Sequence, residues 1–225
     1  MSANDYSKTL YPLQDQILRI VAGLPVDFYL TGGTALSRFH LRHRYSDDLD
    51  FFVNRSEHFK PQLEAVFAAI RASAELALEA GNVSENFARC FVQSGTARMK
   101  LDFVNDVPFR HGTLQAFKEF PRVDSPLNIL TNKLGALTRQ EPKDMADILF
   151  IARQHAFDWQ SMVSHAKEKD LWVNEVDIAR IIDEFDLRQF SKVVWIKALD
   201  VHQAEHDLKQ IAWDILKANA NSLFH

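Results

Sequence analysis

The strongest constraint on the fold comes from residues 48–53, where Asp48, Leu49, Asp50 and Phe51 alternate acidic and apolar side chains. Side chains at alternate positions of a β-strand leave from the same face. Leu49 and Phe51 would therefore pack into a core, while the two aspartates lie on the opposite face. The segment predicts a half-buried strand that carries two carboxylates on its polar side.

The first half of the chain shows helical and strand patterns in alternation. Helices are predicted at residues 6–22, 34–43 and 56–78, and the last of these ends before Gly81. Strands are predicted at residues 25–30, 48–53, 86–93 and 97–106, with a hairpin turn between the last two. This order predicts an α/β or α+β half built on a sheet.

The second half contains only helical patterns. Ser125 is a helix cap and Pro126 stands at the first helical position of a segment that ends at residue 139. A further helix is predicted at residues 141–155, and helical patterns continue to the end of the chain. We therefore predict two domains, an α/β core at residues 1–124 and an all-α domain at residues 125–225.

Composition limits the classes of protein to which the chain can belong. Of its 225 residues, 47% are hydrophobic and the formal net charge is −4, which argues against a broadly basic nucleic-acid surface. The single cysteine, Cys90, excludes an internal disulfide and lies in an apolar run that predicts burial. No apolar stretch approaches the ~20 residues that span a bilayer. A cytoplasmic protein without membrane contact is expected.

A third acid, Asp102, lies in the later strand "MKLDFV", and Lys100 shares its face. If that strand lies beside residues 48–53, Asp48, Asp50 and Asp102 would meet on one face of the sheet. Clustered carboxylates repel one another unless a positive charge compensates them, and Mg²⁺ or Mn²⁺ prefers such oxygen ligands. The alternative is that Asp47 and Asp48 cap a turn while Asp102 faces solvent.

A glycine pair precedes the acids. Gly32 and Gly33 end the first predicted strand, and Thr34 stands near the start of the following helix. Backbone N–H groups at such a turn can hold phosphate. A lone glycine pair is more often only a turn, but this one closes the strand that precedes the acids. The P-loop ending Gly-Lys-Ser/Thr is absent, which excludes a Walker-type NTPase.

The segment "GGTALSRFHLRHRYSDDLDFF" resembles the signature of nucleotidyltransferases with the polymerase-β-type fold. More narrowly, it is similar to the AbiEii/AbiGii-type nucleotidyltransferases, which include toxins of type IV toxin–antitoxin and phage-abortive systems. Arg44 and Ser46 occupy the "R-x-S" positions of that pattern. The later segment "NKLGALTRQEPKDMADILFI" is similar to a second block of the family, with Ile148 where leucine is usual. Lys133, Arg139, Asp144 and Asp147 hold its polar positions.

The resemblance implies a mixed sheet with flanking helices and an enzyme that moves a nucleoside monophosphate from an NTP to an acceptor hydroxyl. Asp48, Asp50 and Asp102 would hold Mg²⁺ or Mn²⁺, and Asp102 would draw the acceptor proton. The nucleotide phosphates would contact the following residues: Gly32, Gly33, Thr34, Ser46 and Lys133. Asp144 would be a further catalytic acid. An RNA such as tRNA, or a protein, would be the acceptor, and an antitoxin would be a partner.

Other interpretations remain open from the residues alone. Lys133 is equally well explained as a solvated helix residue, and Asp144 and Asp147 as structural partners of Arg139 or Lys143. Residues 38–44 would contact nucleic-acid phosphate if they were helical. A catalytically inactive relative that binds nucleotide or a partner is the alternative function. The enzyme hypothesis requires the three acids to converge without a salt-bridged arginine in their pocket.

Overall fold

The computed structural model describes residues 5–224, which divide into two compact units. The first, here the sheet unit, comprises the described residues up to Phe39 together with Tyr45–Ser125. The second, the helical unit, comprises His40–Arg44 and the described residues from Pro126 onward. Five residues inside the first half of the chain therefore belong to the helical unit.

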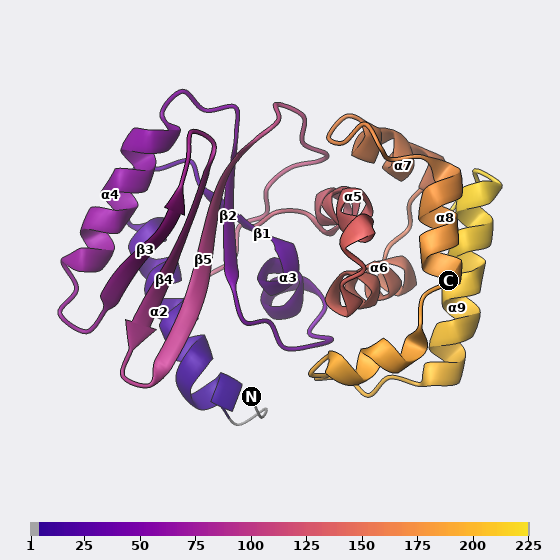
Figure 1. Cartoon of the computed structure of the whole chain (residues 1–225), viewed down its shortest axis with the longest axis horizontal. Coiled ribbons are helices and arrows are strands. Elements are labelled where there is room, and N and C mark those ends of the chain that lie inside the picture. The colour runs from indigo at the N-terminus through magenta and orange to yellow at the C-terminus, as the bar shows by residue number, and fades with distance from the viewer. Residues whose placement is uncertain (1–4, 225) are drawn as a thin grey trace. The chain divides into compact units, whose positions relative to one another are not determined.

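The sheet unit alternates helices and strands as its sequence pattern predicts. Its elements are η1 (Tyr6–Leu10), α2 (Tyr11–Ala22), β1 (Tyr29–Thr31), α3 (Gly32–Ala35), η2 (Leu36–His40), β2 (Leu49–Asn54), α4 (Phe59–Arg71), β3 (Ala77–Val83), β4 (Phe87–Ser94) and β5 (Ala97–Asp106). The strands form one sheet in the order β1-β2-β5-β4-β3 (Figure 1). Strands β2 and β5 are parallel, and the other neighbouring pairs are antiparallel.

One face of this sheet is an aromatic and aliphatic core. Phe51 and Phe103 lie on neighbouring strands, are fully buried and stack with ring centroids 5.3 Å apart. Phe67 of α4 contacts Phe103 edge-on, so α4 covers this face. Cys90 is also buried there, as expected, and burial raises the pKa of its thiol to about 12. The acids of β2 and β5 lie on the opposite face.

The helical unit contains the remaining elements of the described chain. They are α5 (Pro126–Ala136), η3 (Leu137–Arg139), α6 (Pro142–Gln154), α7 (Trp159–Lys167), α8 (Glu175–Asp183), η4 (Leu187–Lys192) and α9 (Val201–Leu216). Helix α5 packs on α6 and α7, while α8 and α9 pack side by side (Figure 1). A mixed sheet with flanking helices, followed by helices alone, confirms the predicted α+β class.

The helix predicted at residues 56–78 is wrong in its second half. Helix α4 ends at Arg71, and residues 77–83 form the edge strand β3, which includes Gly81. All but one of the side chains of β3 are exposed, so the strand lacks the apolar alternation that marks a half-buried strand. Backbone pairing with β4 holds it in the sheet.

Two smaller predictions also differ from the structure. The strand predicted at residues 25–30 is confined to Tyr29–Thr31, and the helix predicted at residues 34–43 ends at His40. Residues His43 and Arg44 are not helical and are fully buried, so they do not form the solvent-facing basic strip considered for nucleic acid. Burial of an arginine requires a partner, which is found in α6.

No helix in the described part of the chain, residues 5–224, has both the length and the apolar character needed to cross a membrane.

Candidate active site

The register of the sheet brings the acids together on its polar face. Asp50 of β2 lies directly beside Asp102 of β5, and Thr31 of β1 lies on the other side of Asp50. Asp48 immediately precedes β2, two residues before Asp50, and is half-exposed. The strand of Asp102 therefore lies beside the strand of Asp50, the arrangement that an acid cluster requires.

Two basic residues of the neighbouring strands are paired with these acids. Arg89 of β4 lies opposite Asp102, and its Nε and terminal nitrogen each lie 2.8 Å from one oxygen of that carboxylate. Lys100 Nζ lies 2.9 Å from Asp48 Oδ2 and 3.2 Å from Asp102 Oδ2. The polar face thus carries its own compensating charge, which sequence analysis had assigned to a metal ion alone.

These pairs fix the charge state of Asp102. Burial by itself would raise the pKa of Asp102, but the hydrogen bond from Arg89 and the charge of Lys100 outweigh burial and lower it. The pKa of Lys100 is raised, because its contacts with Asp48 and Asp102 outweigh the effect of burial. A carboxylate held ionised in this way suits the binding of a cation better than the removal of a proton.

The turn between β1 and α3 lies against the acids. Gly32 has a φ of +69°, and a Cβ at this position would overlap the carboxylate of Asp50. Only glycine meets both demands without strain. The hydroxyl of Thr34 donates to the backbone carbonyl of Asp48, so Thr34 anchors the acid segment to α3. Ser46 is buried in the same segment, and its carbonyl accepts from Gln14 Nε2 at 3.0 Å.

A second charged cluster lies within the helical unit. Arg44 donates from two nitrogens to Asp147, at 2.8 and 2.7 Å, and His43 Nε2 lies 2.8 Å from the same carboxylate. Lys133 Nζ lies 2.8 Å from Asp147 and 2.5 Å from Asp144. Asp144 and Asp147 therefore do have structural partners, but these are different residues from Arg139 and Lys143.

The electrostatics of this cluster follow from its burial. Burial by itself would raise the pKa of Asp147, but the charges of Arg44 and Lys133 hold it well below its usual range. Asp147 and Asp144 raise the pKa of Lys133 against the opposing effect of burial. Burial lowers the pKa of His43, whose Nδ1 has no hydrogen-bond partner among residues 5–224. His43 is consequently neutral, and its Nε2–H donates to Asp147.

The donor chemistry of the polar face fits a hard divalent cation. Asp48, Asp50 and Asp102 offer carboxylate oxygens, the ligands that Mg²⁺ and Mn²⁺ prefer, and Lys100 shows that this face accepts a cation. The contacts of Asp102 with Arg89 and Lys100 occupy both of its oxygens. Among the residues described, 5–224, no three His, Cys, Asp or Glu side chains are arranged as a metal site.

Comparison with protein families decides the class of the chain. Residues 16–215 match the model described as nucleotidyl transferase AbiEii toxin, type IV TA system. The chain belongs to this family of nucleotidyltransferase toxins. Because Arg89 does pair with Asp102, the assignment of nucleotidyltransferase activity rests on this match rather than on an open metal pocket.

Solved structures agree with the family in their fold. JHP933 from Helicobacter pylori has a TM-score of 0.61 and 19% sequence identity, with 96% of this chain and 94% of that chain covered. MenT4, a nucleotidyltransferase toxin from Mycobacterium tuberculosis, has a TM-score of 0.59 and 12% identity, with 92% and 82% covered. None of the curated proteins matches the chain.

Arg89 is not predicted as a partner of the acids from the sequence, and Lys100 is not given that role. A signal for both was present, because Lys100 alternates onto the face of Asp102 and Arg89 lies in the preceding strand of the same hairpin. The partners of Asp147 carried no such local signal, since His43 and Arg44 lie more than a hundred residues earlier in the chain.

Proposed function

We propose that this nucleotidyltransferase is magnesium-dependent and transfers a nucleoside monophosphate from a nucleoside triphosphate to an acceptor hydroxyl of RNA, such as a tRNA, or of a protein. The observation that carries the proposal is the register of β2 and β5, which sets Asp50 beside Asp102 with Asp48 next to them. Family membership supports the reaction class. An antitoxin protein of a type IV toxin–antitoxin system is the proposed partner.

The proposed reaction balances as a substitution at phosphorus. The acceptor hydroxyl releases its proton to water as its oxygen attacks the α-phosphorus, the bond to the α,β-bridging oxygen breaks, and pyrophosphate leaves with the bonding electron pair. Magnesium held by Asp48 and Asp50, with Asp102, would neutralise negative charge that develops in this step. The chain's own contribution is to position the reactants and to keep Asp102 ionised.

The remaining predicted site residues enter with narrower roles. We propose that the backbone of Gly32 and Gly33 contacts phosphate oxygens, while Thr34 and Ser46 hold the acid segment in place through the contacts described above. Because Lys133 and Asp144 match polar positions of the family's second block, we propose that Lys133 binds phosphate and that Asp144 positions Lys133. In the helical unit, the bond between these two side chains supports that pairing.

The test is transfer of label from each of the four nucleoside triphosphates, with magnesium, to total RNA or to a cell extract depleted of RNA. The double variant Asp48→Asn plus Asp50→Asn is expected to lose at least about a hundredfold in rate, the scale for removal of a charge-stabilising group. Asp47→Asn is the matched control, because Asp47 adjoins these acids but accepts from Tyr6.

Two outcomes would count against the proposal. Transfer that persists in the double variant would remove the acids from the mechanism. Nucleotide binding by the wild type without any transfer to either acceptor would favour the inactive, binding-only relative. Omission of the divalent ion is expected to abolish transfer to both acceptors.

A further inference from the structure

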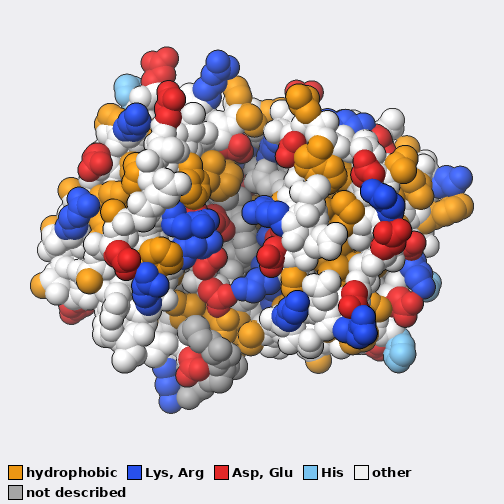
Figure 2. Space-filling model, in the orientation of Figure 1, with side chains coloured by type: hydrophobic (Ala, Val, Ile, Leu, Met, Phe, Trp, Pro, Cys, Tyr) orange, Lys and Arg blue, Asp and Glu red, His pale blue; other side chains and the backbone are white. Residues whose placement is uncertain are grey.

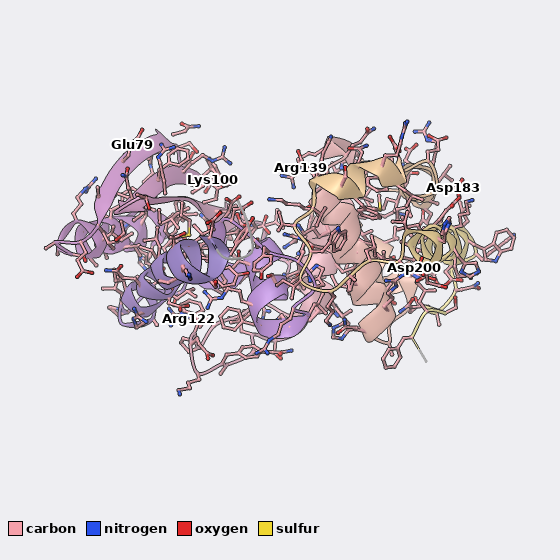
Figure 3. The ribbon with its side chains drawn as sticks, turned by 90° about the horizontal axis from the view of Figure 1, so that it is seen from below. Glu79, Lys100, Arg122, Arg139, Asp183 and Asp200 are labelled. Carbon is pink, nitrogen blue, oxygen red and sulfur yellow. The ribbon has the colours of Figure 1, made fainter. Side chains whose placement is uncertain are left out.

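Lys100 occupies a position that a metal ion would need. It projects from β5 on the same face as Asp102, two residues away, among the side chains of the sheet unit (Figure 3). Its ammonium bridges two strands, since it contacts Asp48 beside β2 and Asp102 within β5. The oxygens that it contacts belong to the carboxylates proposed to hold the divalent cation.

Arg89 and Lys100 differ in how firmly they are held. Arg89 lies directly across the antiparallel ladder from Asp102 and engages both of its oxygens with a rigid planar fork. Lys100 makes one contact with each acid through a compact ammonium on a flexible four-carbon stem. Lys100 can therefore leave its partners by rotation of its own side chain, whereas Arg89 is held by register and fork together.

The charges make release of Lys100 favourable when a divalent ion arrives. Three carboxylates face two protein cations, so the face retains one net negative charge when Lys100 is in place. Addition of a doubly charged ion beside the ammonium would put like charges within contact distance. Departure of the ammonium removes this repulsion. It also frees Asp48 Oδ2 and leaves Asp102 Oδ2 in contact with Arg89.

We propose that Lys100 is an internal competitor for the divalent cation: it pairs with Asp48 and Asp102 in the metal-free protein and leaves them when the ion binds. The inference rests on the proposed function, because it takes these acids to be the metal-binding carboxylates. Lys100 would then set the concentration of divalent ion that the enzyme requires. In the absence of the ion, Lys100 would balance part of the negative charge of Asp48 and Asp102.

The experiment measures Mn²⁺ binding to the full chain without nucleotide, by electron paramagnetic resonance of free Mn²⁺ and by calorimetry. Lys100→Met removes the charge and keeps most of the stem. It is expected to bind Mn²⁺ about tenfold more tightly than the wild type, or to bind one ion more, the tenfold figure corresponding to the loss of two weak ion pairs. Lys100→Arg keeps the charge and is expected to show neither change.

Arg98→Met is the matched control. Arg98 lies on β5 two residues before Lys100, and this substitution removes the same charge as Lys100→Met. Arg98 pairs at 2.9 Å with Glu79 rather than with Asp48 or Asp102. Figure 3 labels Lys100 and Glu79 in the sheet unit. Equal tightening by Arg98→Met and Lys100→Met would mean that net charge alone is responsible and would overturn the proposal. Unchanged or weaker Mn²⁺ binding by Lys100→Met would overturn it as well.

A second measurement uses the wild type, so it does not depend on the folding of a variant. The rate at which an acylating reagent labels Lys100, read by mass spectrometry, is expected to rise when Mn²⁺ is added, because the amine leaves its two carboxylates. An unchanged or lower rate contradicts displacement. Failure of the proposed function is recognised separately, as normal Mn²⁺ binding without nucleotide transfer.

Discussion

Single residues in this chain act mainly through the charges that they bring to buried or half-buried carboxylates. Asp102 and Asp147 each receive an arginine through two nitrogens and a lysine, one in each unit. A bidentate arginine fixes the orientation of a carboxylate, whereas a lysine contributes charge with little geometric demand. The same combination therefore keeps both acids ionised in surroundings that would otherwise favour the neutral form.

Neutral His43 leads to a prediction about pH. Its folded-state pKa lies below the unfolded value of about 6.5. The unfolded chain therefore binds this proton first, and stability is lost as the pH falls below about 6.5. Between pH 6.5 and 5.5 this group is expected to cost at most about 1 kcal/mol of stability. His43→Gln keeps an N–H donor for Asp147 and should show a flatter pH dependence.

The measurement is urea unfolding of both proteins at pH 7.5, 6.5 and 5.5. The difference between the two pH profiles isolates His43, because the other titrating groups, including His155 with its lowered pKa, are common to both. Identical profiles for the wild type and His43→Gln would show that His43 carries its proton equally in the folded and unfolded chain.

At the scale of elements, the junction of β1 and α3 sets the shape of the acid face. The chain turns from strand to helix at Gly32, whose positive φ and missing Cβ leave space for the carboxylate of Asp50. Strand β2 then runs antiparallel to β1, which places Thr31 opposite Asp50. Movement of this junction would move Asp50 directly, because the carboxylate lies against the turn.

Gly32→Ala tests this junction. It introduces a side chain where φ is +69° and where the Asp50 carboxylate already lies. We expect the free energy of unfolding to fall by about 1–3 kcal/mol and nucleotide transfer to fall at least about tenfold. Gly95→Ala is the matched control, because Gly95 also has a positive φ, +56°, but a Cβ added there would lie in open space.

Unfolding and transfer are measured on both variants. Gly95→Ala should lose stability through backbone strain but keep its transfer rate, since its hairpin turn is remote from the acids in the sheet register. Equal transfer by Gly32→Ala and the wild type would contradict a role for this turn in placing Asp50.

At the scale of the whole molecule, the two units are not two uninterrupted stretches of chain. His40–Arg44 belongs to the helical unit although it precedes β2. The backbone of Arg44 forms an isolated antiparallel β-bridge with Trp195. The side chains of Arg44 and His43 bind Asp147 of α6. Charges of both signs are interspersed on the face of each unit shown in Figure 2, without a continuous basic field, in line with the net charge of −4.

Residues 126–225 expressed alone are therefore expected to lack stable folding. The fragment loses Arg44 and His43 and leaves Asp147 with Lys133, which Asp144 also binds. Removal of one partner from a buried pair costs about 3–5 kcal/mol. Near-ultraviolet circular dichroism and urea unfolding of the fragment provide the measurement.

Asp147→Asn in the same fragment removes the charge that has lost Arg44 and His43 and should restore part of the stability. A fragment that unfolds cooperatively with the stability of the full chain would show that residues 40–44 are dispensable to the helical unit. In that case the predicted boundary between residues 124 and 125 would also be a folding boundary.

The sequence alone determined the features that depend on local periodicity. Alternation placed Asp48, Asp50 and Asp102 opposite the apolar core, and helical spacing with capping residues located α5 and α6. The glycine pair and the acids also carried the family resemblance. The edge strand β3 escaped prediction, because its exposed side chains leave no apolar alternation and its pairing with β4 is made by the backbone.

Which charges meet depends on the arrangement of the elements in space. Arg89 and Lys100 reach the acids because β4, β5 and β2 are neighbours, and His43 and Arg44 reach Asp147 across more than a hundred residues of sequence. Pairing between charges depends on distance in space, while a sequence pattern records only which side of its own helix or strand a residue occupies. The polar face was therefore predictable from the sequence, whereas the pairing of each cation with a particular acid was not.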